Sequence, residues 1–156
     1  MIEGHGDDIY SYSKEIISNF SSNVFGRQDM SALDEHLQEN IHSIHSYPEP
    51  DARSLARLIA DKNDVSISNV CITNGATDAI YLIAQAFANK KTAVIIPTFS
   101  EYEDACRIHG HNLSFYERPD DISANIQLVW LCNPNNPNGY VYDKDLLENI
   151  VRRHPD

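Results

Sequence analysis

The chain has 156 residues, 42% of them hydrophobic and 22% charged, a balance typical of a globular protein with a sizeable core. Its formal net charge of -11 argues against nucleic acid or an anionic membrane surface as the partner, because both select basic patches. The N-terminal residues lack the basic and apolar regions of a signal peptide, and no apolar stretch reaches membrane-spanning length, so we expect a cytoplasmic protein.

Apolar spacing and turn residues predict helices and strands that alternate along most of the chain. Two amphipathic helices come first, over residues 30–44 and 51–63, and Asp51 is the expected N-cap of the second. Further strands and helices then alternate, with strands at 69–73, 92–97, 112–117 and 126–131 and helices at 75–88, 100–110 and 143–153. This order predicts an α/β layered domain with a mainly parallel sheet.

The stretch TNGATDA, residues 73–79, joins a predicted strand to a predicted helix and is a candidate anion site. Gly75 permits close approach of the backbone, and the amides of Gly75, Ala76 and Thr77 open a helix N-terminus. The Thr77 hydroxyl and the positive end of the helix dipole complete a site suited to phosphate. The alternative is an ordinary turn in which Thr77 or Asp78 caps the helix.

Two more turns follow predicted strands, and ligands of α/β sheets bind at the carboxyl ends of the strands. The stretch IPTFSEY places Phe99 and Tyr102 just beyond a strand, either as core residues or as rings that stack on a flat ligand. The stretch NPNNPNG, residues 133–139, has a backbone restricted by prolines and side-chain amides that can donate to a phenolate oxygen. Together the three turns indicate a pocket for a phosphorylated aromatic cofactor.

Four stretches resemble, in their order along the chain, the fold-type-I pyridoxal-phosphate enzymes of the aspartate aminotransferase superfamily: YPEPDARSLARLIA, TNGATDAIYLIAQAF, IPTFSEYEDA and NPNNPNG. Within this superfamily the chain is most similar to the L-threonine-O-3-phosphate decarboxylases of cobalamin biosynthesis and to histidinol-phosphate aminotransferases. The resemblance implies a three-layer αβα large domain with an N-terminal arm. Residues 1–50 would form the arm and a small-domain segment, and residues 51–156 the first part of the large domain.

The resemblance also implies pyridoxal 5'-phosphate as the cofactor and assigns residues to it. Gly75, Ala76 and Thr77 would hold the phosphate, Phe99 would stack on the pyridine ring, and Asn136 would hydrogen-bond the ring oxygen. When it is bound, the cofactor provides the electron sink for cleavage at the α-carbon of a phosphorylated amino acid.

Residues nearer the N-terminus are implied in assembly and substrate binding. Tyr47, in SYPEP, resembles the tyrosine that reaches the cofactor phosphate of the other subunit, so we expect a homodimer. His5, in GHGDD, and Asn23, in FSSN, resemble the substrate contacts of the decarboxylases. For His5 the alternative is a solvated terminus.

The family's Schiff-base lysine lies further along the chain, and the lysines of this sequence stand in unrelated contexts. The 156 residues are therefore expected to be the N-terminal half of the enzyme, without a catalytic residue of their own. For the full-length protein the sequence favours decarboxylation of threonine phosphate. The alternatives are transamination of histidinol phosphate and a non-catalytic α/β module that kept only the phosphate site.

Overall fold

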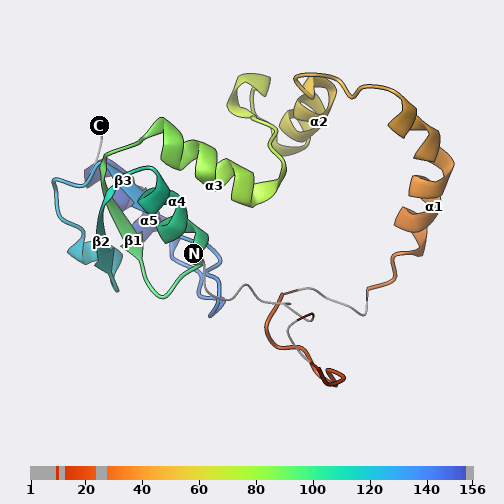
Figure 1. Cartoon of the computed structure of the whole chain (residues 1–156). Coiled ribbons are helices and arrows are strands. Elements are labelled where there is room, and N and C mark those ends of the chain that lie inside the picture. Colours follow the sequence, from red (N-terminus) through yellow and green to blue (C-terminus); the bar gives the residue numbers. More distant parts are fainter. Residues whose placement is uncertain (1–9, 11–12, 24–27, 154–156) are drawn as a thin grey trace. The chain divides into compact units, whose positions relative to one another are not determined.

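The computed structural model describes residues 10, 13–23 and 28–153, and Figure 1 shows the order of its elements. The chain divides into two compact units, the first ending at Ile72 and the second beginning at Thr73, and each is described by itself. The predicted division into an arm of residues 1–50 and a large-domain part of residues 51–156 remains a prediction.

The first unit is helical, as predicted. Helix α1 (Ser31–Asn40) continues into the 3-10 helix η2 (Ile41–His45), and α2 (Arg53–Asn63) is followed by η3 (Ile67–Asn69). The two most buried side chains of α2 are the small ones of Ala56 and Ala60. Larger apolar residues on α1 and η2 are exposed, including Leu37 at 56% and Ile44 at 72%.

The prediction that Asp51 caps α2 is wrong. The N-cap position is Ala52, whose backbone is left-handed (φ 45°). Its methyl side chain cannot accept a hydrogen bond from the first turn of the helix. This turn brings Glu49 to the helix start, where Glu49 Oε2 accepts from the Ser54 amide (2.9 Å) and from the Ser54 hydroxyl (2.6 Å). The carboxylate therefore satisfies an amide of the first turn from outside the helix.

The second unit is built on a parallel three-stranded sheet, which confirms the predicted α/β class. Strands β1 (Lys91–Ile95), β2 (Asn112–Tyr116) and β3 (Leu128–Trp130) lie in the order β2-β1-β3. Three helices accompany them, together with one 3-10 helix: α3 (Gly75–Ala86), α4 (Glu101–Ile108), α5 (Lys144–Arg153) and η4 (Pro119–Asp121). Each helix and strand expected after residue 74 is present, with ends shifted by a few residues.

The predicted strand over residues 69–73 does not form. Residues 67–69 belong to η3, and residues 70–73 are irregular. A strand needs a neighbour whose backbone can complete its ladder, and the described sheet consists of β1, β2 and β3 alone. The apolar pattern is typical of a strand, but a strand also needs a neighbouring strand, which the pattern cannot supply.

The sheet has a core on each face because successive side chains of β1 point in opposite directions. On one face, Val94 packs with Ile80 and Ala84 of α3 and with Ala105 and Cys106 of α4. On the other face, Ala93 and Ile95 pack with Ile122 and Ile126. Helices α3 and α4 thus cover the first face.

No helix in the described part of the chain is both long and apolar enough to span a membrane.

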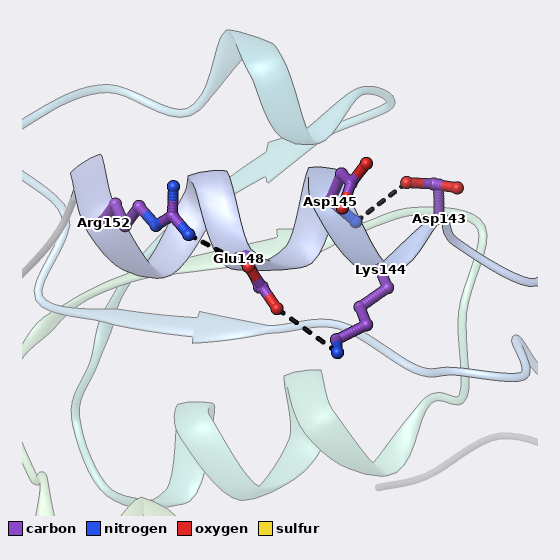
Figure 2. A network of polar contacts seen from close by, with 5 residues as sticks. All are labelled: Asp143, Lys144, Asp145, Glu148 and Arg152. Carbon is purple, nitrogen blue, oxygen red and sulfur yellow. Dashed lines mark hydrogen bonds and ion pairs between the residues drawn. The ribbon is translucent and has the colours of Figure 1, made fainter.

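Helix α5 is amphipathic, and polar contacts organise its outer side (Figure 2). Asp143 Oδ1 accepts from the Asp145 amide (2.8 Å), and Glu148 pairs with Lys144 (3.6 Å) and Arg152 (3.0 Å). Such exposed pairs each add little to stability. Ile150 is the buried residue of this helix.

Candidate functional site

The first turn of α3 presents unpaired donors. Outside the helix, no described residue accepts a hydrogen bond from the amides of Gly75, Ala76 or Thr77. The Thr77 side chain is exposed, and its hydroxyl likewise has no partner in the described ranges. A helix N-terminus with free amides and a free hydroxyl is suited to an anion.

The residues around this turn fix its backbone and leave the amides of its first turn without a partner among the described residues. Gly75 has a φ of +88°, which L side chains rarely adopt, and a Cβ built there would meet nothing within 4 Å. Glycine is therefore needed for the backbone conformation and not for space. The Thr73 hydroxyl donates to the Gly75 carbonyl (3.0 Å), and Asp78 Oδ2 accepts from the Asn74 amide (2.9 Å). Asp78 thus fulfils part of the capping alternative, while the first-turn amides stay available.

Phe99 lies in the loop that follows β1. Its half-buried ring packs against the core cluster to which Ile80 of α3 belongs, and it meets the ring of Tyr102 edge to face at 6.1 Å. Both readings of Phe99 from the sequence therefore have a structural basis, since the ring touches the core and keeps part of its surface free. The neighbouring Thr98 has a buried hydroxyl with no hydrogen-bond partner among the described residues.

Three of the four asparagines in NPNNPNG hold their own loop together. Asn133 Oδ1 accepts from the Tyr142 amide (2.9 Å). Asn135, only 8% exposed, donates through Nδ2 to the Pro97 carbonyl (2.9 Å) and to Asn138 Oδ1 (2.8 Å). Asn138 Oδ1 also accepts from the Tyr140 amide (3.0 Å).

Asn136 is different. Its side chain is half-buried, and within the described residues its amide makes no hydrogen bond. Among the four asparagines of this loop, Asn136 is therefore the one whose side-chain oxygen and nitrogen are both without a partner among the described residues.

The structure brings the Phe99 loop and the asparagine loop together. The bond from Asn135 to the Pro97 carbonyl joins the segments that follow β1 and β3, at the carboxyl edge of the sheet. Helix α3 is connected to the same region, because Tyr81 and Phe99 pack against one cluster. Burial, followed by a hydrogen bond to Glu101 and its charge, raises the pKa of the Tyr81 phenol. Tyr81 thus links α3 to the first residue of α4.

The remaining predicted site residues do not belong to the second unit. Tyr47 and Asn23 belong to the first unit, and both side chains are exposed. His5 lies outside the described residues. Sequence reasoning missed Thr98 and the structural role of Asn135. The position of Thr98, directly between a strand end and a candidate stacking ring, was the available signal.

Comparison with known proteins identifies the class of protein. Residues 15–155 match the family model of the class I and II aminotransferases, and the chain belongs to this family. The family's cofactor is pyridoxal 5'-phosphate. These findings confirm the resemblance seen in the sequence.

Particular relatives include both activities considered from the sequence. The chain is 29% identical over 148 residues to histidinol-phosphate aminotransferase of Halalkalibacterium halodurans, covering 87% of this chain and 40% of the relative. It is similar to the crystal structure of L-threonine-O-3-phosphate decarboxylase of Porphyromonas gingivalis, with 39% identity, a TM-score of 0.81 and coverage of 87% and 45%.

A third structure, histidinol-phosphate aminotransferase of Sinorhizobium meliloti in complex with pyridoxal 5'-phosphate, gives a TM-score of 0.72 at 18% identity and supports the fold alone. The matched region covers 80% of this chain and 37% of the Sinorhizobium meliloti chain. The chain thus spans less than half the length of these relatives.

Proposed function

We propose that this chain contributes the phosphate and ring contacts of a pyridoxal-phosphate site in an enzyme that decarboxylates L-threonine O-3-phosphate. The free amide of Asn136 is the observation that carries the cofactor assignment. Three neighbouring asparagines are engaged in the loop, whereas the Asn136 side chain has no partner among the described residues and is available to an acceptor on a ligand.

The donors present match the parts of the cofactor. Its phosphate is a dianion, and the first turn of α3 offers the free amides of Gly75, Ala76 and Thr77 with one hydroxyl. Its ring is flat, and Phe99 has a partly free aromatic face. Its phenolic oxygen is an acceptor for Asn136 Nδ2. The Thr98 hydroxyl, which is buried and has no partner among the described residues, is a further polar group next to Phe99 in the sequence.

The chemistry divides between cofactor and protein. When bound, the cofactor supplies an electron sink for the bond that breaks at the α-carbon. Thr77 and the neighbouring amides would hold the phosphate end, Phe99 would pack against the ring, and Asn136 would donate to the ring oxygen.

The choice of decarboxylation rests on similarity. Identity to the threonine-phosphate decarboxylase is 39%, against 29% and 32% for two histidinol-phosphate aminotransferases, those of Halalkalibacterium halodurans and Caldanaerobacter subterraneus. Those aminotransferases support transamination of histidinol phosphate as the second candidate. Both substrates are phosphorylated amino compounds. The third candidate is a non-catalytic α/β module that kept only the phosphate site.

The remaining parts of the proposal concern the whole protein. We place Tyr47 at the cofactor phosphate of the neighbouring subunit in a homodimer, and its fully exposed ring in the described first unit leaves it accessible to a partner. We assign His5 and Asn23 to the substrate. The Schiff-base lysine is proposed to lie outside residues 1–156.

A product assay on the full-length protein separates the candidates. With cofactor and threonine phosphate, decarboxylation releases carbon dioxide and leaves the phosphate ester of 1-aminopropan-2-ol. With histidinol phosphate and 2-oxoglutarate, transamination forms glutamate. The proposal expects the first pair of products and no glutamate. Glutamate formation alone would establish the aminotransferase, and cofactor binding without either product would establish the non-catalytic module.

A further inference from the structure

Three aromatic side chains form a row that leads from the core to the candidate cofactor site. Trp130 of β3 stacks on Tyr102 of α4, with centroids 4.9 Å apart and planes 21° from parallel. Tyr102 in turn meets Phe99 edge to face, at 6.1 Å and 88°. Both arrangements are favourable geometries for aromatic pairs, so the orientation of each ring depends on the next.

The inner end of this row is fixed. Trp130 is 9% exposed, and its indole Nε1 donates to the Sγ atom of Cys106 (3.1 Å), which is fully buried. Trp130 also pairs with Val94 in the register of β1 and β3. A ring held by both a strand and a hydrogen bond cannot rotate freely, and it offers Tyr102 a rigid surface.

The Tyr102 hydroxyl lies beside Cys132, the residue that precedes the asparagine loop. Burial, followed by the Cys132 thiol, raises the pKa of the Tyr102 phenol to about 12. Cys132 Sγ donates to the Pro134 carbonyl (3.3 Å) inside that loop.

We propose that Tyr102 is a positioning residue that holds the Phe99 ring in the arrangement that binds the cofactor. This inference rests on the proposed function, because Phe99 is one of its cofactor contacts. Tyr102 acts through Phe99, since its ring contacts the rigid Trp130 ring on one side and the Phe99 ring on the other.

Two substitutions in the full-length protein separate the ring contacts from the hydroxyl. Tyr102→Leu removes both ring contacts, and we expect it to weaken the affinity for pyridoxal phosphate by about threefold to tenfold and to alter the circular dichroism of the bound cofactor. Tyr102→Phe keeps the rings and removes the hydroxyl. We expect it to retain the wild-type affinity and dichroism, because the ring contacts to Trp130 and Phe99 remain.

Leu113→Ala is the matched control. Leu113 packs against the same core cluster, but it pairs with Thr92 near the amino-terminal end of β1, away from the loop of Phe99. It should lower the melting temperature of the apoprotein and leave the affinity and the dichroism of the bound cofactor unchanged.

The measurements are a cofactor titration, the dichroism of the cofactor absorption band, and the melting temperature of each apoprotein. The inference is overturned if Tyr102→Leu follows the control, losing only thermal stability, or if Tyr102→Phe weakens the affinity as much as Tyr102→Leu does. A wild-type protein that does not bind the cofactor would instead overturn the proposed function, and this outcome is visible before any variant is made.

Discussion

The side-chain amide of Asn135 donates to the main-chain carbonyl of Pro97 at 2.9 Å and thereby joins the loop after β3 to the loop after β1. Asn135 is 8% exposed, so water cannot easily replace it. Its neighbour Asn136 makes no such bond within the described residues. Two adjacent asparagines thus have separable roles, one in structure and one in binding.

Replacing Asn135 is expected to destabilise the apoprotein. Asn135→Ala leaves the Pro97 carbonyl without its donor and removes one of the two donors to Asn138 Oδ1, which should cost about 1–3 kcal/mol of unfolding free energy. Denaturant unfolding of the apoprotein measures this. The exposed Asn125→Ala is the control and should change little. Equal stability of the two variants would show that the bond between the loops is unimportant.

Asn136→Ala is expected to act in the opposite way. Stability of the apoprotein should stay near the wild-type value, because no bond within the described structure is lost. The pH at which the colour of the bound cofactor changes should shift, since the amide donor to the ring oxygen is removed. A spectroscopic pH titration tests this, and an unchanged midpoint would remove Asn136 from the ring oxygen.

Thr77→Ala tests the phosphate turn. It removes one hydrogen bond to a charged group, and we expect a loss of about 1.5–3 kcal/mol in cofactor binding free energy. Thr77→Ser keeps the hydroxyl and should retain most of the affinity. If a cofactor titration finds the alanine variant as tight as wild type, the phosphate is held elsewhere.

Phe99→Leu distinguishes stacking from core packing. Leucine preserves much of the apolar volume against the core but has no aromatic face, so cofactor affinity should fall while the apoprotein keeps its melting temperature. The two quantities are measured on the same preparation. A large drop in melting temperature with unchanged affinity would assign Phe99 to the core.

Tyr47 tests the assembly. If it completes the phosphate site of the neighbouring subunit, Tyr47→Phe should weaken cofactor binding without changing the unfolding of the apoprotein, since the ring is fully exposed in the described unit. Sedimentation with bound cofactor should show a dimer. A protein that stays monomeric at micromolar concentration with cofactor bound would contradict this role.

Much of the second unit could be predicted because its strands and helices differ in period and length. The pattern failed over residues 69–73, where a strand depends on a neighbour that local sequence cannot provide. It also misplaced the cap of α2, because the left-handed turn at Ala52 brings Glu49 to the helix start. In both places the structure depends on hydrogen bonds from groups that local sequence preference does not include: a neighbouring strand for residues 69–73, and the Glu49 carboxylate at the start of α2.

The location of the candidate site could be predicted from the sequence, but the hydrogen bonds within it could not. Turns at the carboxyl edge of a parallel sheet can be found from the sequence, and two of them are joined in the structure by Asn135. Which asparagine holds the loop and which is free depends on side-chain hydrogen bonds across the loop. The row from Trp130 to Phe99 was equally hidden, because its members come from different elements.

The central claim is that these residues contribute the cofactor contacts of a pyridoxal-phosphate enzyme whose reactive lysine lies elsewhere in the protein. The direct measurement is to load the full-length protein with cofactor, reduce it with borohydride and map the modified peptide by mass spectrometry. The account predicts stoichiometric labelling of one lysine outside residues 1–156. Stoichiometric labelling of a lysine within this chain, whether Lys14, Lys62, Lys90, Lys91 or Lys144, or no labelling at all, would contradict it.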